Sequence, residues 1–295
     1  MPNRELAFYL NPRGPDRRGI MKALADAAIQ KIGIDGCPWQ PPDAADEIEA
    51  FHQDLAEFDL SVYSMHALPC FLATADSDAP PDLADALHRD LERLAAMGGK
   101  TAVYHACMMR DVPPEKTDDA IDAVGWEAFL ERYSASVGAL ARAAARHGIT
   151  IVIENIWFSE RAKTVRGYMD IIEAAGEPNV GIILDSGHAH LCGLSIADEI
   201  RAAGKHLRDT HFHDNIGPID GQFIDQHIPP GLGTIDWQSA CQALNDIAFP
   251  GPIVFEGVLG PGDSIEKGHF HGLLTHPDLI RITIDNWRAF EAMVG

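Results

Sequence analysis

The chain has 295 residues, of which 46% are hydrophobic and 7% aromatic, as is typical of a soluble globular protein. Its 23 Lys and Arg against 44 Asp and Glu give a formal net charge of -21. Such an acidic surface repels nucleic-acid phosphates and anionic membranes, so we expect neither as a partner. The length fits two average domains or one α/β barrel of about 250 residues.

The cysteines are isolated, odd in number and without a CxxC pair: Cys37, Cys70, Cys107, Cys192 and Cys241. This pattern indicates free thiols in a reducing compartment. The first residues lack the apolar segment of a signal peptide, and no run approaches the roughly 18 apolar residues that span a bilayer. We therefore expect a cytoplasmic protein.

Short β-type runs alternate with amphipathic helical stretches. The predicted strands are Leu6 to Leu10, Ile34 to Trp39, Leu60 to Met65, Thr101 to Tyr104, Thr150 to Ile153, Val180 to Leu184, His206 to Thr210 and Pro252 to Phe255. The predicted helices are Ile20 to Ile32, Asp43 to Phe58, Pro81 to Met97, Trp126 to His147, Thr164 to Ala175, Ile196 to Ala203, Asp236 to Ile247 and Asp278 to Met293. Four glycines stand where left-handed helix C-caps are expected: Gly33, Gly99, Gly148 and Gly176.

Strands that alternate with helices form right-handed βαβ units and a parallel sheet, and eight such units can close into a barrel. An open doubly wound sheet is the competing architecture, but no GxGxxG follows the first strand. The chain contains no low-complexity segment and no linker long enough to divide domains. We predict an α/β fold, a (β/α)8 TIM barrel formed as one domain by residues 1–295.

Polar side chains follow six consecutive predicted strands: His66, His105, Glu154, Asp185, His211 and Glu256. Active sites of TIM barrels lie at the C-terminal ends of the strands, so a barrel points all six toward one axis. Each residue alone has a structural explanation, as a helix N-cap or a hydrogen-bonded histidine. The joint pattern favours a divalent metal site, because mixed carboxylate and imidazole ligands suit Mn²⁺, Mg²⁺, Co²⁺ or Zn²⁺.

The segment from Asp209 to Trp237 holds three histidines and five aspartates separated by glycine and proline, and we predict that it is a metal-binding loop. The secondary candidates are His188, three residues after Asp185, and the pair Asp225 and His227 within this segment. Gly231 and Gly233 are expected to allow tight turns. Asp236 is expected to cap the following helix. Five other histidines are expected to be surface or loop residues: His190, His206, His213, His269 and His271.

The motifs resemble those of the xylose-isomerase-like TIM-barrel superfamily, which includes sugar isomerases, sugar epimerases and the endonuclease IV type of AP endonuclease. The resemblance rests on IEN at Glu154, LDSGH at Asp185 and His188, HFHD at His211, DQHIPPGLG at Asp225 to Gly233, and FEG at Glu256.

Two branches of the superfamily imply different ligand sets. Resemblance to the ketose 3-epimerases implies one metal held by Glu154, Asp185, His211 and Glu256, with the two glutamates as acid and base. It also implies that His188 binds a substrate oxygen and that Glu160 is a further substrate contact. Resemblance to the AP endonucleases implies three zinc ions held by nine residues: His66, His105, Glu154, Asp185, His188, His211, Asp225, His227 and Glu256. The net charge and the lack of clustered Lys and Arg favour the sugar branch.

We therefore expect a sugar isomerase or epimerase that acts on a ketose or keto-sugar through an enediolate, with Mn²⁺ ranked first among the metals. Trp39, Phe71 and Trp157 are candidates for the apolar wall of the substrate pocket. A lyase or dehydratase acting on a keto-sugar or cyclitol, a zinc phosphodiesterase and a non-catalytic carbohydrate-binding barrel are the alternatives. The chain has no evident phosphate-cradling glycine loop, which favours a non-phosphorylated sugar, and a homo-oligomer is left open.

Overall fold

A computed structural model describes residues 3–35, 45–67, 81–109, 112–260 and 273–295. Eight parallel strands form one sheet in the order β7-β6-β5-β4-β3-β2-β1-β8. The strands are β1 Leu6–Leu10, β2 Lys31–Asp35, β3 Ser61–His66, β4 Thr101–His105, β5 Thr150–Glu154, β6 Val180–Asp185, β7 Leu207–His211 and β8 Ile253–Phe255. The α-helices are α1 Arg17–Asp26, α2 Ala45–Glu57, α3 Pro81–Ala96, α4 Thr117–Val124, α5 Trp126–Ala145, α6 Val165–Ala175, α7 Ser186–Leu191, α8 Ile196–Ala203, α9 Trp237–Asp246 and α10 His276–Val294. Two 3-10 turns, η1 Pro114–Lys116 and η2 Gly204–His206, precede α4 and β7.

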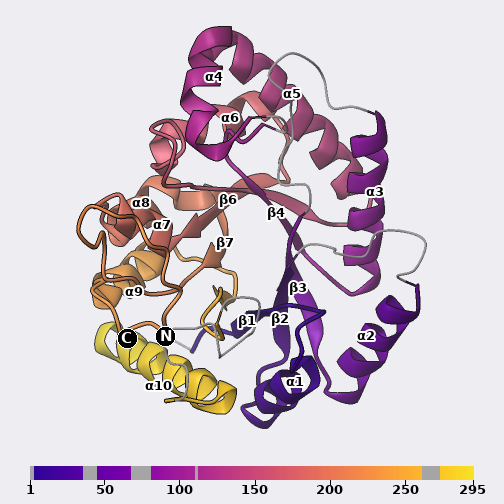
Figure 1. Ribbon diagram of the computed structural model, residues 1–295, viewed down its shortest axis with the longest axis vertical. Helices are drawn as coiled ribbons and strands as arrows, with labels where there is room; N and C mark the ends of the chain where they lie inside the picture. Colours follow the sequence, from indigo (N-terminus) through magenta and orange to yellow (C-terminus); the bar gives the residue numbers. More distant parts are fainter. Residues whose placement is uncertain (1–2, 36–44, 68–80, 110–111, 261–272) are drawn as a thin grey trace.

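The sheet closes through Phe212, the residue that follows β7. The Phe212 amide donates to the Val254 carbonyl at 2.9 Å, and the Glu256 amide donates to the Phe212 carbonyl at 3.3 Å. These two bonds join β7 to β8, and the helices surround the strands as an outer ring (Figure 1). Helix α10 packs beside α9 and α1, which brings the two ends of the chain near each other. The predicted TIM barrel is confirmed.

A large apolar core fills the space between strands and helices, whereas the barrel interior contains a polar layer. Asp209 is fully buried there and accepts hydrogen bonds from Thr101 Oγ1 at 2.5 Å and Ser64 Oγ at 2.7 Å. Burial raises the pKa of the Asp209 carboxyl despite these donors. The Tyr9 ring, in the same layer, meets the His211 ring edge-on with centroids 4.8 Å apart. This layer forms the floor beneath the strand ends.

The region around β2 differs from the prediction. Helix α1 ends at Asp26 rather than Ile32, and β2 begins at Lys31 rather than Ile34. The chain reverses at Ala28, a non-glycine residue with φ of +59°, which no local sequence signal announces. Gly33 lies inside β2 and is therefore no helix cap. An added Cβ at this position would lie 2.2 Å from the Tyr9 ring. The glycine is needed for close packing against β1.

The other predicted caps and boundaries are closer to the structure. Gly148 and Gly176 adopt left-handed φ values of +68° and +67°, as predicted. At the end of α3 the left-handed residue is Gly98, with φ of +86°, and not Gly99. Helices α4 and α7 lie in segments without a predicted helix, because both are too short to show a clear 3.6-residue period. No helix in the described ranges is long and apolar enough to cross a membrane.

Candidate metal centre

Four of the predicted ligands converge at the C-terminal ends of the strands. Glu154, Asp185, His211 and Glu256 each offer one ligand atom, and these atoms all lie within 4.8 Å of one another. His211 Nδ1 is 2.9 Å from Glu154 Oε1 and 3.3 Å from Glu256 Oε2. Glu154, Asp185 and His211 are at most 1% exposed, whereas the Glu256 side chain is 14% exposed. The group therefore lies at the bottom of the barrel mouth.

Two local features fix the ends of β5 and β6. Asn155, directly after Glu154, donates from Nδ2 to the Asp185 carbonyl at 2.9 Å, and the Asp185 amide donates back to Asn155 Oδ1 at 2.8 Å. Asp185 is also the N-cap of α7, because its Oδ1 accepts from the His188 amide at 2.7 Å. The carboxylate that faces the centre is thus held by the first turn of the next helix.

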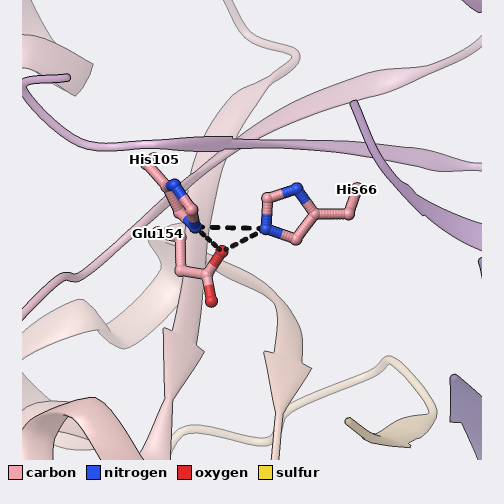
Figure 2. Close-up of side chains that lie close together, drawn as sticks. All are labelled: His66, His105 and Glu154. Carbon is pink, nitrogen blue, oxygen red and sulfur yellow. Dashed lines mark hydrogen bonds and ion pairs between the residues drawn. The ribbon is translucent and has the colours of Figure 1, made fainter. Parts of the chain in front are cut away.

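A second group lies beside the first and shares Glu154 with it. His66 Nε2 and His105 Nε2 are 3.1 Å apart, and they lie 3.3 Å and 3.5 Å from Glu154 Oε2 (Figure 2). These three side chains also satisfy the spacing of a metal site. Glu154 directs Oε1 to the first group and Oε2 to the second.

A third group forms around Asp225 and His227, but its remaining member differs from the expectation. The ligand atoms of His213, Asp225 and His227 lie within 4.8 Å of one another. His188 is close as well, with Nε2 at 3.3 Å from Asp225 Oδ2. The assignment of His213 to the surface was wrong, since this side chain is fully buried. The overlooked signal is strand alternation, because His211 and His213 both point inward while Phe212 points into the outer core.

The remaining predicted site residues are placed as follows. The Trp157 ring lies at the mouth against His188, with centroids 4.5 Å apart. The Glu160 side chain is 78% exposed and pairs with Lys163, away from the three groups. Trp39 and Phe71 lie outside the described residues.

The segment between β7 and α9 is anchored by Asp214, which is fully buried. Its carboxylate accepts hydrogen bonds from the amides of Asn215, Gly231 and Ile235 and from Trp237 Nε1, at 2.7–3.2 Å. Gly231 has the predicted turn conformation, with φ of +88°. Gly233 is needed for close approach instead, because an added Cβ would lie 2.3 Å from Asp214 Oδ1.

Asp236 caps α9 as predicted, by accepting from the Ser239 amide at 3.0 Å.

Asp35 is a mouth residue that the sequence prediction missed, because β2 had been placed too far along the chain. It ends β2 and pairs in register with His66 at the barrel mouth. Desolvation within the mouth, together with the nearby Glu256 carboxylate, raises the pKa of Asp35.

Histidines supply the counter-charges for the buried carboxylates. Burial is the largest influence on Glu154 and Glu256, and alone it would raise the pKa of both carboxyls. The surrounding histidines together outweigh burial and hold each pKa well below its usual value: His211, His66 and His105 at Glu154, and His211 and His227 at Glu256. In turn, these carboxylates and Asp225 outweigh desolvation and raise the pKa of His211 and of His227 to about 9.

The residues fit a divalent cation. In the described part of the chain, no Lys or Arg forms an ion pair with Glu154, Asp185, Asp225 or Glu256. Glu154 Oε2 and Asp225 Oδ1 are buried without a hydrogen-bond partner. Buried carboxylates need a positive partner, and the mixed oxygen and nitrogen donors match Mn²⁺, Mg²⁺, Co²⁺ or Zn²⁺.

Comparisons with known proteins agree with this geometry. An inosose isomerase of Bacillus velezensis is 31% identical over 105 residues, which is 35% of this chain and 38% of that protein. A ketose 3-epimerase of Arthrobacter globiformis is 26% identical over 206 residues, which is 68% of this chain and 60% of that protein. The chain thus spans less than two thirds of the length of these relatives.

Among solved structures, the IOLI protein with a bound zinc atom superimposes with a TM-score of 0.69 at 16% identity, over 98% of this chain and 99% of that chain. This likeness shows a shared fold. The model of the xylose isomerase-like TIM barrel family matches residues 27–269, which is more than half of the chain. The chain therefore belongs to the xylose isomerase-like TIM barrel family.

Proposed function

We propose that the protein is a divalent-metal-dependent sugar isomerase or epimerase that transfers a proton next to the carbonyl of a ketose or keto-sugar. The observation that carries this proposal is the position of two glutamates beside one imidazole nitrogen. Glu154 Oε1 and Glu256 Oε2 lie 2.9 Å and 3.3 Å from His211 Nδ1, at the mouth of the barrel. The ketose 3-epimerase and the inosose isomerase among the relatives support this reaction class.

The resident cation would be held by Glu154, Asp185, His211 and Glu256. When bound, it would polarise the substrate carbonyl and make the neighbouring C–H more acidic. We rank Mn²⁺ first, with Mg²⁺, Co²⁺ and Zn²⁺ as alternatives. The zinc atom in the IOLI structure supports keeping Zn²⁺ in this set.

The two glutamates are the proposed acid and base. The depressed pKa values leave both carboxylates ionised near neutral pH, so either can accept the proton that leaves the substrate carbon. The product of this step is an enediolate. Return of the proton by the same glutamate to the adjacent carbon, with transfer of the hydroxyl proton to the former carbonyl oxygen, completes an isomerisation. Epimerisation instead requires the second glutamate to carry a proton beforehand and to deliver it to the opposite face.

His188 and Trp157 are the proposed substrate contacts. His188 Nδ1 donates to the Asn155 carbonyl at 2.8 Å, which leaves Nε2 on the side of Asp225 and the mouth. The Trp157 ring beside it offers an apolar face for a sugar. Because the sequence has no evident phosphate-cradling glycine loop, we propose a non-phosphorylated sugar. Free thiols at Cys107, Cys192 and Cys241 support the further proposal of a cytoplasmic location.

A metal-dependent phosphodiesterase is the second candidate. The group of His66, His105 and Glu154 and the group around Asp225 and His227 favour it, because they offer places for further ions. The net charge of -21 opposes a DNA substrate. The lyase or dehydratase retains the same first proton transfer, and a carbohydrate-binding barrel would lack it.

The test is solvent deuterium incorporation into a panel of ketoses and keto-sugars, followed by NMR with Mn²⁺ present. We expect exchange at the carbon next to the carbonyl, and we expect Glu256→Gln to lower its rate by at least about 100-fold. The matched control is Glu57→Gln on the outer helix α2, which should keep the rate. Unchanged exchange in the Glu256 variant would refute the assignment. Three zinc ions per chain together with cleavage of an abasic-site duplex would identify the phosphodiesterase instead.

A further inference from the structure

We infer that His213 is a positioning residue of the metal centre that holds the Asp185 carboxylate in place through its Nε2–H. This role rests on the function proposed above, because it requires Asp185 to be a metal ligand. His213 Nε2 lies 3.2 Å from Asp185 Oδ1 and 3.1 Å from Asp185 Oδ2, and both side chains are fully buried. His213 is not one of the four proposed ligands, so its imidazole contacts one of them without belonging to the group.

The first turn of α7 is shaped around His213. Asp185 accepts the ring N–H, as described. Ser186 holds the backbone, since its Oγ donates to the His213 carbonyl at 2.7 Å and accepts from the His213 amide at 3.0 Å. Gly187 leaves room for the ring, because an added Cβ would lie 1.9 Å from His213 Cε1. Three consecutive residues thus contact one histidine that lies 26 to 28 positions later in the chain.

The opposite side of the ring is also covered. His227 stacks on His213 with centroids 4.0 Å apart and an angle of 20° between the planes. With Gly187 and Ser186 on the α7 side, the imidazole has little freedom to rotate away from Asp185. Hydrogen bonds from neighbouring groups orient metal-binding carboxylates, and their loss commonly lowers metal affinity about 10–100-fold.

The experiment measures Mn²⁺ affinity and the number of ions bound by calorimetry, with chelator-treated protein. We expect His213→Leu to weaken binding about 10–100-fold at an unchanged number of ions. His213→Gln should recover part of the loss, because its amide can still donate, and it keeps the test available if the Leu variant fails to fold. Gly187→Ala should weaken binding while His213 is intact, because the added methyl displaces the ring. Combining Gly187→Ala with His213→Leu should add little further loss. The matched control is His147→Gln in the exposed turn that follows α5.

Three outcomes overturn the inference. If His213→Leu binds Mn²⁺ with the affinity of the wild-type protein, His213 does not position Asp185. Loss of one bound ion, with the affinity of the remaining ion unchanged, makes His213 a ligand of an additional ion together with Asp225 and His227. Fully additive effects of the Gly187 and His213 substitutions show that the glycine serves another purpose. Absence of any Mn²⁺ binding by the wild-type protein would instead refute the proposed function itself.

Discussion

Replacing Asp214 by Asn should destabilise the protein strongly, because its carboxylate accepts hydrogen bonds from four donors that bond to no other acceptor among the described residues. Asn Oδ1 can keep the bonds from the amides of Asn215 and Ile235. Its NH₂ group would then face the amide of Gly231 and Trp237 Nε1, which now reach Asp214 Oδ2 at 2.7 Å and 2.9 Å. Two buried donors without an acceptor cost about 1–3 kcal/mol each, so we expect a loss of about 4 kcal/mol.

Thermal unfolding of metal-free protein, followed by circular dichroism, measures this loss. A protein of this size loses about 2 °C for each kcal/mol, so Tm should fall by about 8 °C. The matched control is Asp236→Asn at the end of the same segment, where Asn is as good an N-cap as Asp and the expected loss is below about 1 kcal/mol. A Tm for the Asp214 variant equal to that of the control would refute the anchoring role. Limited proteolysis should also produce new cuts within residues 215–232 in the Asp214 variant alone.

Other predictions concern pH, helix capping and glycine. Although burial disfavours the imidazolium, neighbouring carboxylates raise the pKa of His211 to about 9, so its proton must leave before a metal binds. Apparent Mn²⁺ affinity should therefore rise with pH up to about 9 and then level off, and calorimetry in buffers of different ionisation enthalpy should detect the released proton. The stability of the metal-free protein should change with pH in the opposite direction. The stabilisation by charged His211 is complete below about pH 6.5 and is lost as the pH rises through 9. The Tm measured with chelator should therefore fall over this range. Thr275→Ala removes the capping box of α10 and should cost about 1 kcal/mol in urea unfolding, and an unchanged midpoint would show that the cap is dispensable. Gly33→Ala should lower the free energy of unfolding more than Gly98→Ala, because the added methyl at Gly33 meets the Tyr9 ring. The methyl at Gly98 meets nothing within 4 Å and only strains the backbone by about 1–2 kcal/mol. The reverse order would contradict the packing role of Gly33.

The position of the candidate metal centre could be predicted from the sequence because barrel topology brings residues that are far apart in the chain to one location. The strands are short, and β3 to β8 each end at, or directly before, a His, Asp or Glu. Parallel strands in a barrel end on the same face, so His66, Asp185 and Glu256 meet although they lie up to 190 positions apart. No knowledge of loop conformation was needed for this step.

Other features depend on contacts that a local pattern does not encode. The turn at Ala28 has neither glycine nor proline, so the boundary between α1 and β2 was misplaced and Asp35 was missed. His213 lies two residues beyond the end of β7, where the alternation continues and the pairing with β8 runs through the single bridge between Phe212 and Phe255. Its role becomes visible only when Ser186 and Gly187 are placed beside it, which requires the packing of β6 against β7.

Glu154 explains why one ligand set can suit both a sugar enzyme and a multi-metal enzyme. Its two oxygens serve two neighbouring groups, so the number of ions depends on what occupies the His66 and His105 nitrogens. In the structure these nitrogens contact each other at 3.1 Å, and a hydrogen bond at that distance requires one imidazole to donate and the other to accept. The two nitrogens can therefore share a proton or bind a second metal ion, but they cannot do both at once. The first leaves a one-ion centre with a proton-bearing histidine pair beside Glu154, one of the two glutamates proposed above as acid and base.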